Sequence, residues 1–174
     1  MRITLFHILS LVLFSVVTDQ HLKANGPSAP VWSVAHVDTL PQVFMIGQNE
    51  DKYENLVSTC SKPLLNVCDD SMDTAYRRWM LMLSDIEKYA DKSEFDIKGI
   101  KIWLNVFWNS DGSIRHLVYF PKPNSRNMDF DDLTIFLGNF AKGYQMEIPA
   151  SNCFSHYGSA AFPSFAEYYL NEEK

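Results

Sequence analysis

Serine, histidine and aspartate residues of this chain provide the parts of a nucleophilic hydrolase. Ser155 and His156 are followed by Ser159, and Asp111 and His116 lie together further upstream. A hydroxyl that is activated by a histidine, which a carboxylate orients, is the usual arrangement for acyl transfer. The Gly-x-Ser-x-Gly pattern of a nucleophile elbow is absent. We therefore expect a non-catalytic protein, and a small exported hydrolase using His156 with Ser155 or Ser159 is the alternative.

The three cysteines point to a disulfide rather than to a metal. Cys60 and Cys68 are close in the sequence, and in an exported chain such a pair can close a small loop. We expect Cys153 to be a free thiol, although an odd number of cysteines also allows a different pairing. None of the paired Cys or His spacings of zinc sites occurs, and the glycines are scattered singly, without a phosphate-binding loop. We expect no metal and no cofactor.

A polar loop after residue 121 is the candidate binding surface. It presents five hydrogen-bonding side chains, those of Lys122, Asn124, Ser125, Arg126 and Asn127, next to two prolines that restrict it. Such a turn can hold a carboxylate, a phosphate or a peptide backbone. Asn and Ser also satisfy the backbone of ordinary turns, so a structural role for this loop is the first expectation and binding is the second.

A β-hairpin is the element that positions these residues. Residues 100–108 and 113–120 are rich in β-branched and aromatic types, and a turn containing Asp111-Gly112 joins them. The alternation in the first run places Ile102, Leu104, Val106 and Trp108 on one face. Other elements of the chain must pack on that apolar face to bury it.

Amphipathic helices on both sides of the hairpin can supply this cover. Apolar residues recur at helical spacing over residues 70–90 and 129–142, with Asp70-Ser71 and Asp129 as N-caps. Residues 40–47 read as a loop with a brief helix after it, and the tail supplies a third strand and a terminal helix. The fold class is therefore α+β, with a small antiparallel sheet built on the central hairpin and packed against two amphipathic helices, in a single domain over residues 40–174.

The first residues are typical of a targeting signal. A positive start is followed by a largely apolar stretch over residues 3–17, too short to span a bilayer. We expect a signal peptide at residues 1–24, with an uncleaved anchor as the alternative, then a flexible tether at residues 25–39. We expect no stable membrane span after cleavage, and we expect a periplasmic or secreted protein. The net charge of −6 argues against nucleic-acid binding.

Residues 95–165 resemble the C-terminal domain of TonB-type energy transducers. The resemblance rests on Gly99 at the start of the first strand, the apolar alternation over residues 102–106, the Asp111-Gly112 turn and the capped helix over residues 129–143. It implies a non-catalytic periplasmic module that binds an envelope protein or peptide by adding a strand to an exposed sheet edge. Only 8 scattered prolines occur, so we infer a relative of the domain without the energy-transducing role.

Prolines indicate where such an edge can lie. Pro121 and Pro123 blunt the end of the second strand. The usable edge is therefore expected along the first strand of the hairpin or on the strand drawn from the tail.

Overall fold

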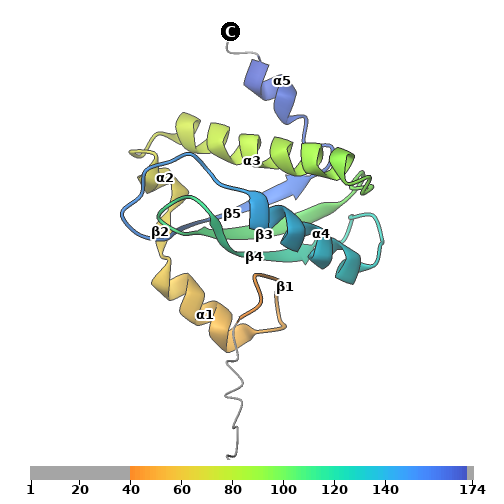
Figure 1. Cartoon of the computed structure of the whole chain (residues 1–174), viewed down its shortest axis with the longest axis horizontal. Helices are drawn as coiled ribbons and strands as arrows, with labels where there is room; N and C mark the ends of the chain where they lie inside the picture. The colour runs from red at the N-terminus through yellow and green to blue at the C-terminus, as the bar shows by residue number, and fades with distance from the viewer. Residues whose placement is uncertain (1–39, 172–174) are drawn as a thin grey trace, which may run out of the picture. The chain divides into compact units, whose positions relative to one another are not determined.

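A five-stranded mixed sheet, in the order β1-β4-β3-β5-β2, lies at the centre of the computed structural model, which describes residues 40–171 (Figure 1). Its strands are β1 (Val43–Met45), β2 (Lys62–Pro63), β3 (Lys101–Trp108), β4 (Ile114–Pro121) and β5 (Phe154–Ala161). The helices are α1 (Glu50–Thr59), α2 (Leu64–Val67), α3 (Met72–Lys92), α4 (Phe130–Gly143) and α5 (Ala166–Asn171). The expected signal peptide (1–24) and tether (25–39) lie outside the described residues.

The predicted hairpin is confirmed as β3 and β4. The two strands pair antiparallel from Ile102 opposite Pro121 to Trp108 opposite Ile114. Gly112 closes the turn with a φ of 85°, and its N–H donates to the carbonyl oxygen of Asn109 at 3.0 Å. Glycine is favoured here because L side chains rarely adopt a positive φ.

The strand that we expected in the tail is also confirmed, as β5. Its position makes β3 an inner strand of the sheet. β5 pairs antiparallel with β3 along its whole length, from Lys101 opposite Ala161 to Trp108 opposite Phe154. β3 is therefore bonded on both sides, so the expectation that this first strand of the hairpin could offer an edge is wrong. Two short strands that the sequence did not predict, β1 and β2, pair parallel with β4 and β5. The α+β class is confirmed, and the complete sheet is mixed.

The two long helices cover one face of the sheet, as expected. The apolar face of β3 is fully buried in one core cluster with residues of α3 and α4. α3 and α1 lie on opposite sides of the sheet (Figure 1). The hydroxyl of Ser71 caps α3 by accepting from Thr74 N, and the carboxylate of Asp129 caps α4 by accepting from Asp131 N. Among residues 40–171, no helix is long and apolar enough to cross a membrane.

The terminal helix α5 flanks α3 on the side turned away from α4. The ring of Tyr169 contacts Tyr76 of α3 at 6.3 Å between centroids, and Ser164 N donates to the Glu87 carboxylate at 2.6 Å. On the other side of α3, Tyr89 packs against Phe136 of α4. Because α4 contacts β4 and β1, α5 lies towards the β5 side of the sheet.

Candidate functional site

Helix α1 covers only half of the second face of the sheet. Phe107 of β3 and Val118 of β4 are buried there, in a cluster with Phe44 and Leu56. Asn105 donates through Nδ2 to the hydroxyl of Tyr53 at 3.0 Å, which satisfies a side chain that is only 8% exposed. Among residues 40–171, no helix lies over the residues of β3 before Asn105 on this face, so the cover by α1 ends at this contact.

The uncovered half carries a cluster of aromatic and basic side chains that we call the aromatic face. Five of its members project from the same side of β3, β4 and β5: Lys101, Trp103, Phe120, Tyr157 and Ser159. The sixth, Lys122, directly follows β4, and its N–H donates to the carbonyl oxygen of Lys101 at 2.9 Å. The three rings are all exposed, with Trp103 at 38%, Phe120 at 47% and Tyr157 at 55%. Large exposed rings in one patch are typical of binding surfaces rather than of ordinary solvated strands.

Contacts within the aromatic face fix its geometry. The rings of Trp103 and Tyr157 stack at 5.7 Å between centroids, with 14° between their planes. The ammonium of Lys122 lies 4.1 Å from the centroid of Trp103 and donates to the hydroxyl of Ser159. This cation–π contact holds a positive charge over the rings and within reach of β5.

The outer edge of β5 borders the aromatic face, and most of it is not paired by any of the described residues. β2 covers only Phe154 and Ser155. Phe162 N donates to the carbonyl oxygen of Ile100 at 2.9 Å, so by the alternation of an antiparallel ladder the backbone groups of Tyr157, Ser159 and Ala161 point away from β3. Within residues 40–171, no hydrogen bond reaches these outward groups.

The strand β5 itself also lacks the residue types that usually prevent edge pairing. β5 has the sequence Phe-Ser-His-Tyr-Gly-Ser-Ala-Ala, without proline, lysine or a carboxylate. The opposite side of the sheet differs, because β1 pairs with β4 up to Tyr119 and Pro121 follows at the next outward position. The prediction that Pro121 blunts β4 therefore agrees with the structure, and within the described part of the chain the tail strand carries the unpaired edge.

The predicted binding loop serves mainly to hold the fold. The hydroxyl of Ser125 accepts from Lys101 N at 2.9 Å, and Arg126 N donates to the carbonyl oxygen of Gly99 at 2.8 Å. The guanidinium of Arg126 binds both the carboxylate and the carbonyl oxygen of Asp96, and this hydrogen bond is the main reason that the pKa of Asp96 is lowered.

The remaining members of the loop behave differently from one another. Asn124 and Asn127 are exposed, whereas Lys122 is the member that joins the aromatic face. The sequence singled out Lys122 for its place in a turn. The prediction from the sequence did not include Trp103 and Tyr157. Their residue type and position could have indicated them, since both are aromatic residues on the mixed face of an alternating strand.

The hydrolase residues are not brought together. His156 points towards α3, where its ring lies 4.6 Å from that of Trp79 and burial lowers its pKa. Ser155 and Ser159 project from the opposite face of β5, because successive residues of a strand alternate.

The other two candidate residues, His116 and Asp111, have hydrogen-bond partners elsewhere. The Nδ1 atom of His116 lies 2.9 Å from the carbonyl oxygen of Pro41, and the carboxylate of Asp111 accepts from Ser113 N in the hairpin turn. Within the described part of the chain, no three His, Cys, Asp or Glu side chains gather as a metal site.

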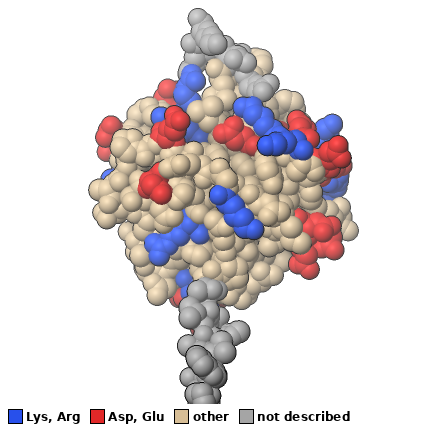
Figure 2. Space-filling view, in the orientation of Figure 1, with Lys and Arg blue, Asp and Glu red and all other residues tan. Residues whose placement is uncertain are grey.

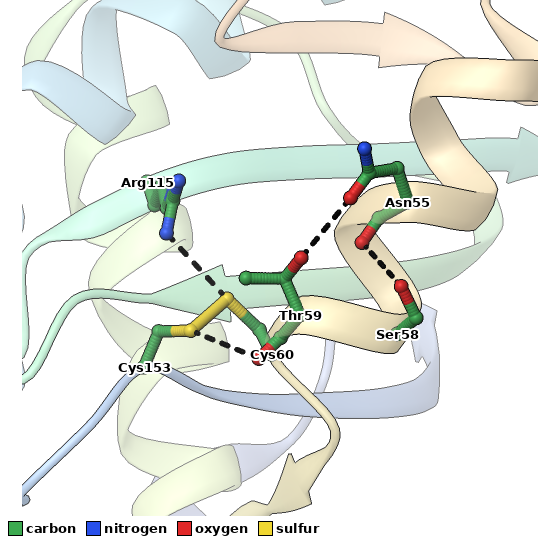
Figure 3. Close-up of a disulfide and its surroundings, with 6 residues drawn as sticks. All are labelled: Asn55, Ser58, Thr59, Cys60, Arg115 and Cys153. Carbon is green, nitrogen blue, oxygen red and sulfur yellow. Dashed lines mark hydrogen bonds between the residues drawn. A yellow bond between two sulfur atoms is a disulfide. The ribbon is translucent and has the colours of Figure 1, made fainter.

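The disulfide joins Cys60 to Cys153 (Figure 3), so the predicted pairing of Cys60 with Cys68 is wrong. The parallel pairing of Lys62 with Phe154 explains this, because it brings the residues just before β2 and β5 together, with 5.1 Å between the two Cα atoms. Cys68 is the free thiol and is buried in the core. The disulfide anchors β2 at the start of β5. It therefore fixes the point at which β2 stops pairing with the outer edge of β5.

A separate cavity of about 660 Å³ lies between the second half of α3, residues 95–98 and residues 163–168. Its lining mixes acidic, basic and aromatic side chains. Two of its carboxylates are already bonded within the protein, that of Glu87 to Ser164 and that of Asp96 to Arg126. The aromatic face and the edge of β5 are therefore the stronger candidate site.

Comparisons with known proteins return no relative of this chain. No family model matches it, and neither a curated protein nor a solved structure matches it.

Proposed function

We propose that this protein is a non-catalytic interaction module of the bacterial envelope that binds an extended segment of a protein partner by strand addition. The binding edge is the outer side of β5. The observation that carries the proposal is the row of outward backbone groups of Tyr157, Ser159 and Ala161, unpaired within the described residues and bordered by the aromatic face. Strand addition uses such a row for affinity and the neighbouring side chains for selectivity.

The geometry defines how the segment would lie. An added strand runs about 4.8 Å from β5 and bonds to the N–H and C=O groups of the three outward residues. Every second side chain of the segment then lies next to Tyr157 and Ser159 on the aromatic face. The side chains between them point to the opposite side, where α5 flanks α3.

Export of the protein is part of the proposal. The apolar leader favours it, and the Cys60–Cys153 disulfide is of the kind that persists in oxidising compartments. The described elements follow the order that the resemblance to TonB-type C-terminal domains implies, in which a helix, a hairpin, a capped helix and a strand succeed one another. Strand addition at an exposed edge is the mode of binding that this resemblance implies.

Two substitutions at one position test the proposal. Ser159→Pro removes an outward N–H, which bonds to nothing within residues 40–171, and leaves the ladder to β3 intact. Ser159→Ala keeps that N–H and removes only the hydroxyl. Purified full-length protein of each type is used to capture envelope proteins, which are identified by mass spectrometry.

The expected result is that Ser159→Ala retains the captured partner and Ser159→Pro loses it, with similar thermal unfolding of both variants. Capture that is equally strong with Ser159→Pro would overturn strand addition at this edge.

A further inference from the structure

We infer that the segment which adds to β5 is an acidic–apolar one, in which Asp or Glu side chains alternate with apolar side chains. This inference rests on the proposed strand addition and specifies the chemistry of the partner. It follows from the different character of the two sides that an added strand would contact.

The strands next to the binding edge carry no acidic residue. The sequences of β3, β4 and β5 contain no Asp or Glu, although the whole chain has a net charge of −6. Acidic and basic side chains are intermingled over the face of the molecule that Figure 2 shows. The acid-free strands are therefore a local departure from the charge balance of the protein, and on the aromatic face the charged side chains are those of Lys101 and Lys122.

Lys122 is held where a carboxylate of the partner would arrive. Its ammonium bonds to the hydroxyl of Ser159, which belongs to the edge strand itself. Cross-strand neighbours have Cβ atoms about 4.5–5.5 Å apart, so a carboxylate opposite Ser159 falls within reach of the ammonium. Packing over Trp103 already restricts the lysine side chain, which reduces the conformational entropy that is lost when a partner binds.

The other side of the edge favours apolar residues. A Cβ added to Gly158 would lie 2.9 Å from the ring of Trp79, which shows that α3 packs directly on β5. Ala160 is the next residue on this side, and the half-exposed rings of Tyr76 and Tyr169 lie on the flank of α3. Small and aromatic groups without charge match apolar side chains of an added strand.

A selection experiment tests the inference with a defined probe. A phage-displayed library of random peptides of about ten residues is selected on the full-length protein, with depletion on the Ser159→Pro variant. We expect the surviving peptides to alternate apolar residues with Asp or Glu. Surviving peptides without this enrichment would overturn the acidic preference while supporting strand addition. A selection that returns no peptide sensitive to Ser159→Pro would overturn both.

Charge substitutions then assign the preference to Lys122. For a selected peptide, Lys122→Gln should weaken binding about threefold or more at low salt, and Lys122→Arg should restore it, in line with an exposed ion pair. Lys142→Gln on α4 removes the same charge far from the edge and serves as the control. Equal losses with Lys122→Gln and Lys142→Gln, or peptides that bind Lys122→Gln as tightly as the original protein, would contradict the inference.

Discussion

Lys122 and Ser159 are hydrogen-bonded to each other across the ring of Trp103, from opposite sides of the central strand. The bond links the loop after β4 to the edge strand β5. It therefore joins the basic residue that the sequence singled out to the open edge that the fold creates. This link is why the aromatic face and the edge of β5 form one site.

The disulfide leads to the first prediction, on thiols and stability. Non-reduced protein in denaturant should titrate a single thiol, that of Cys68, and the native protein should react slowly because Cys68 is buried and its pKa is raised, chiefly by that burial. Replacing Cys60 and Cys153 with serine should lower the free energy of unfolding by about 4 kcal/mol, since the bond closes a long loop. Three thiols in the denatured, non-reduced protein would refute the pairing.

Glycines at positive φ provide a matched pair for the second prediction. A Cβ at Gly112 would lie 1.9 Å from the carbonyl oxygen of Met146, whereas a Cβ at Gly47 meets no atom within 4 Å. Gly112→Ala should therefore cost more than about 2 kcal/mol and Gly47→Ala only about 1 kcal/mol of backbone strain. Urea denaturation measures both. Equal costs would show that the hairpin turn does not pack against residues 145–146.

Much of the fold follows from local sequence patterns, and the missed parts depend on pairing between distant residues. The hairpin, the capped helices α3 and α4 and the tail strand all carry periodic or capping signals of their own. The strands β1 and β2 have three and two residues, too few to show a period. The pairing of Cys60 with Cys153 depends on β2 and could not be read without it.

The candidate site likewise has one part that the local sequence predicts and another that depends on pairing between distant residues. Lys122 lies in a loop that its prolines and hydrogen-bonding side chains make recognisable in the sequence. The role of Tyr157 and Ser159 depends on β5 being the third long strand and on β2 covering only its first two paired residues. Neither fact is encoded near those residues.

Two partly buried histidines lead to a prediction about pH. Burial lowers the pKa of His156 and of His116 below the ordinary value of 6.5. Below this value the unfolded chain binds protons that the folded chain does not, so stability should fall as the pH drops from about 7.5 to about 5.5. His156→Phe keeps a ring against Trp79 and should reduce this pH dependence, as measured by urea midpoints. An unchanged slope in the variant would contradict the assignment.

Arg126 provides a test of the loop's structural role. Arg126→Ala should raise the pKa of Asp96 towards its usual range, because the hydrogen bond from Arg126 is the main cause of its lowering. The pKa of Asp111, which is lowered mainly by Ser113, should not change and is the internal control. Carbon-detected NMR titration measures both. Partner capture should survive Arg126→Ala, and its loss would move the binding site to the loop.

Amide hydrogen exchange at β5, followed by NMR, tests the central claim most directly. In the free protein the amides of Tyr157 and Ser159, which point outward, should exchange fast, whereas those of His156, Gly158 and Ala160, which bond to β3, should exchange slowly. Addition of a selected peptide should slow the two outward amides to the level of their neighbours. Outward amides that are already protected in the free protein, or that stay unprotected when the peptide is bound, would contradict strand addition at this edge.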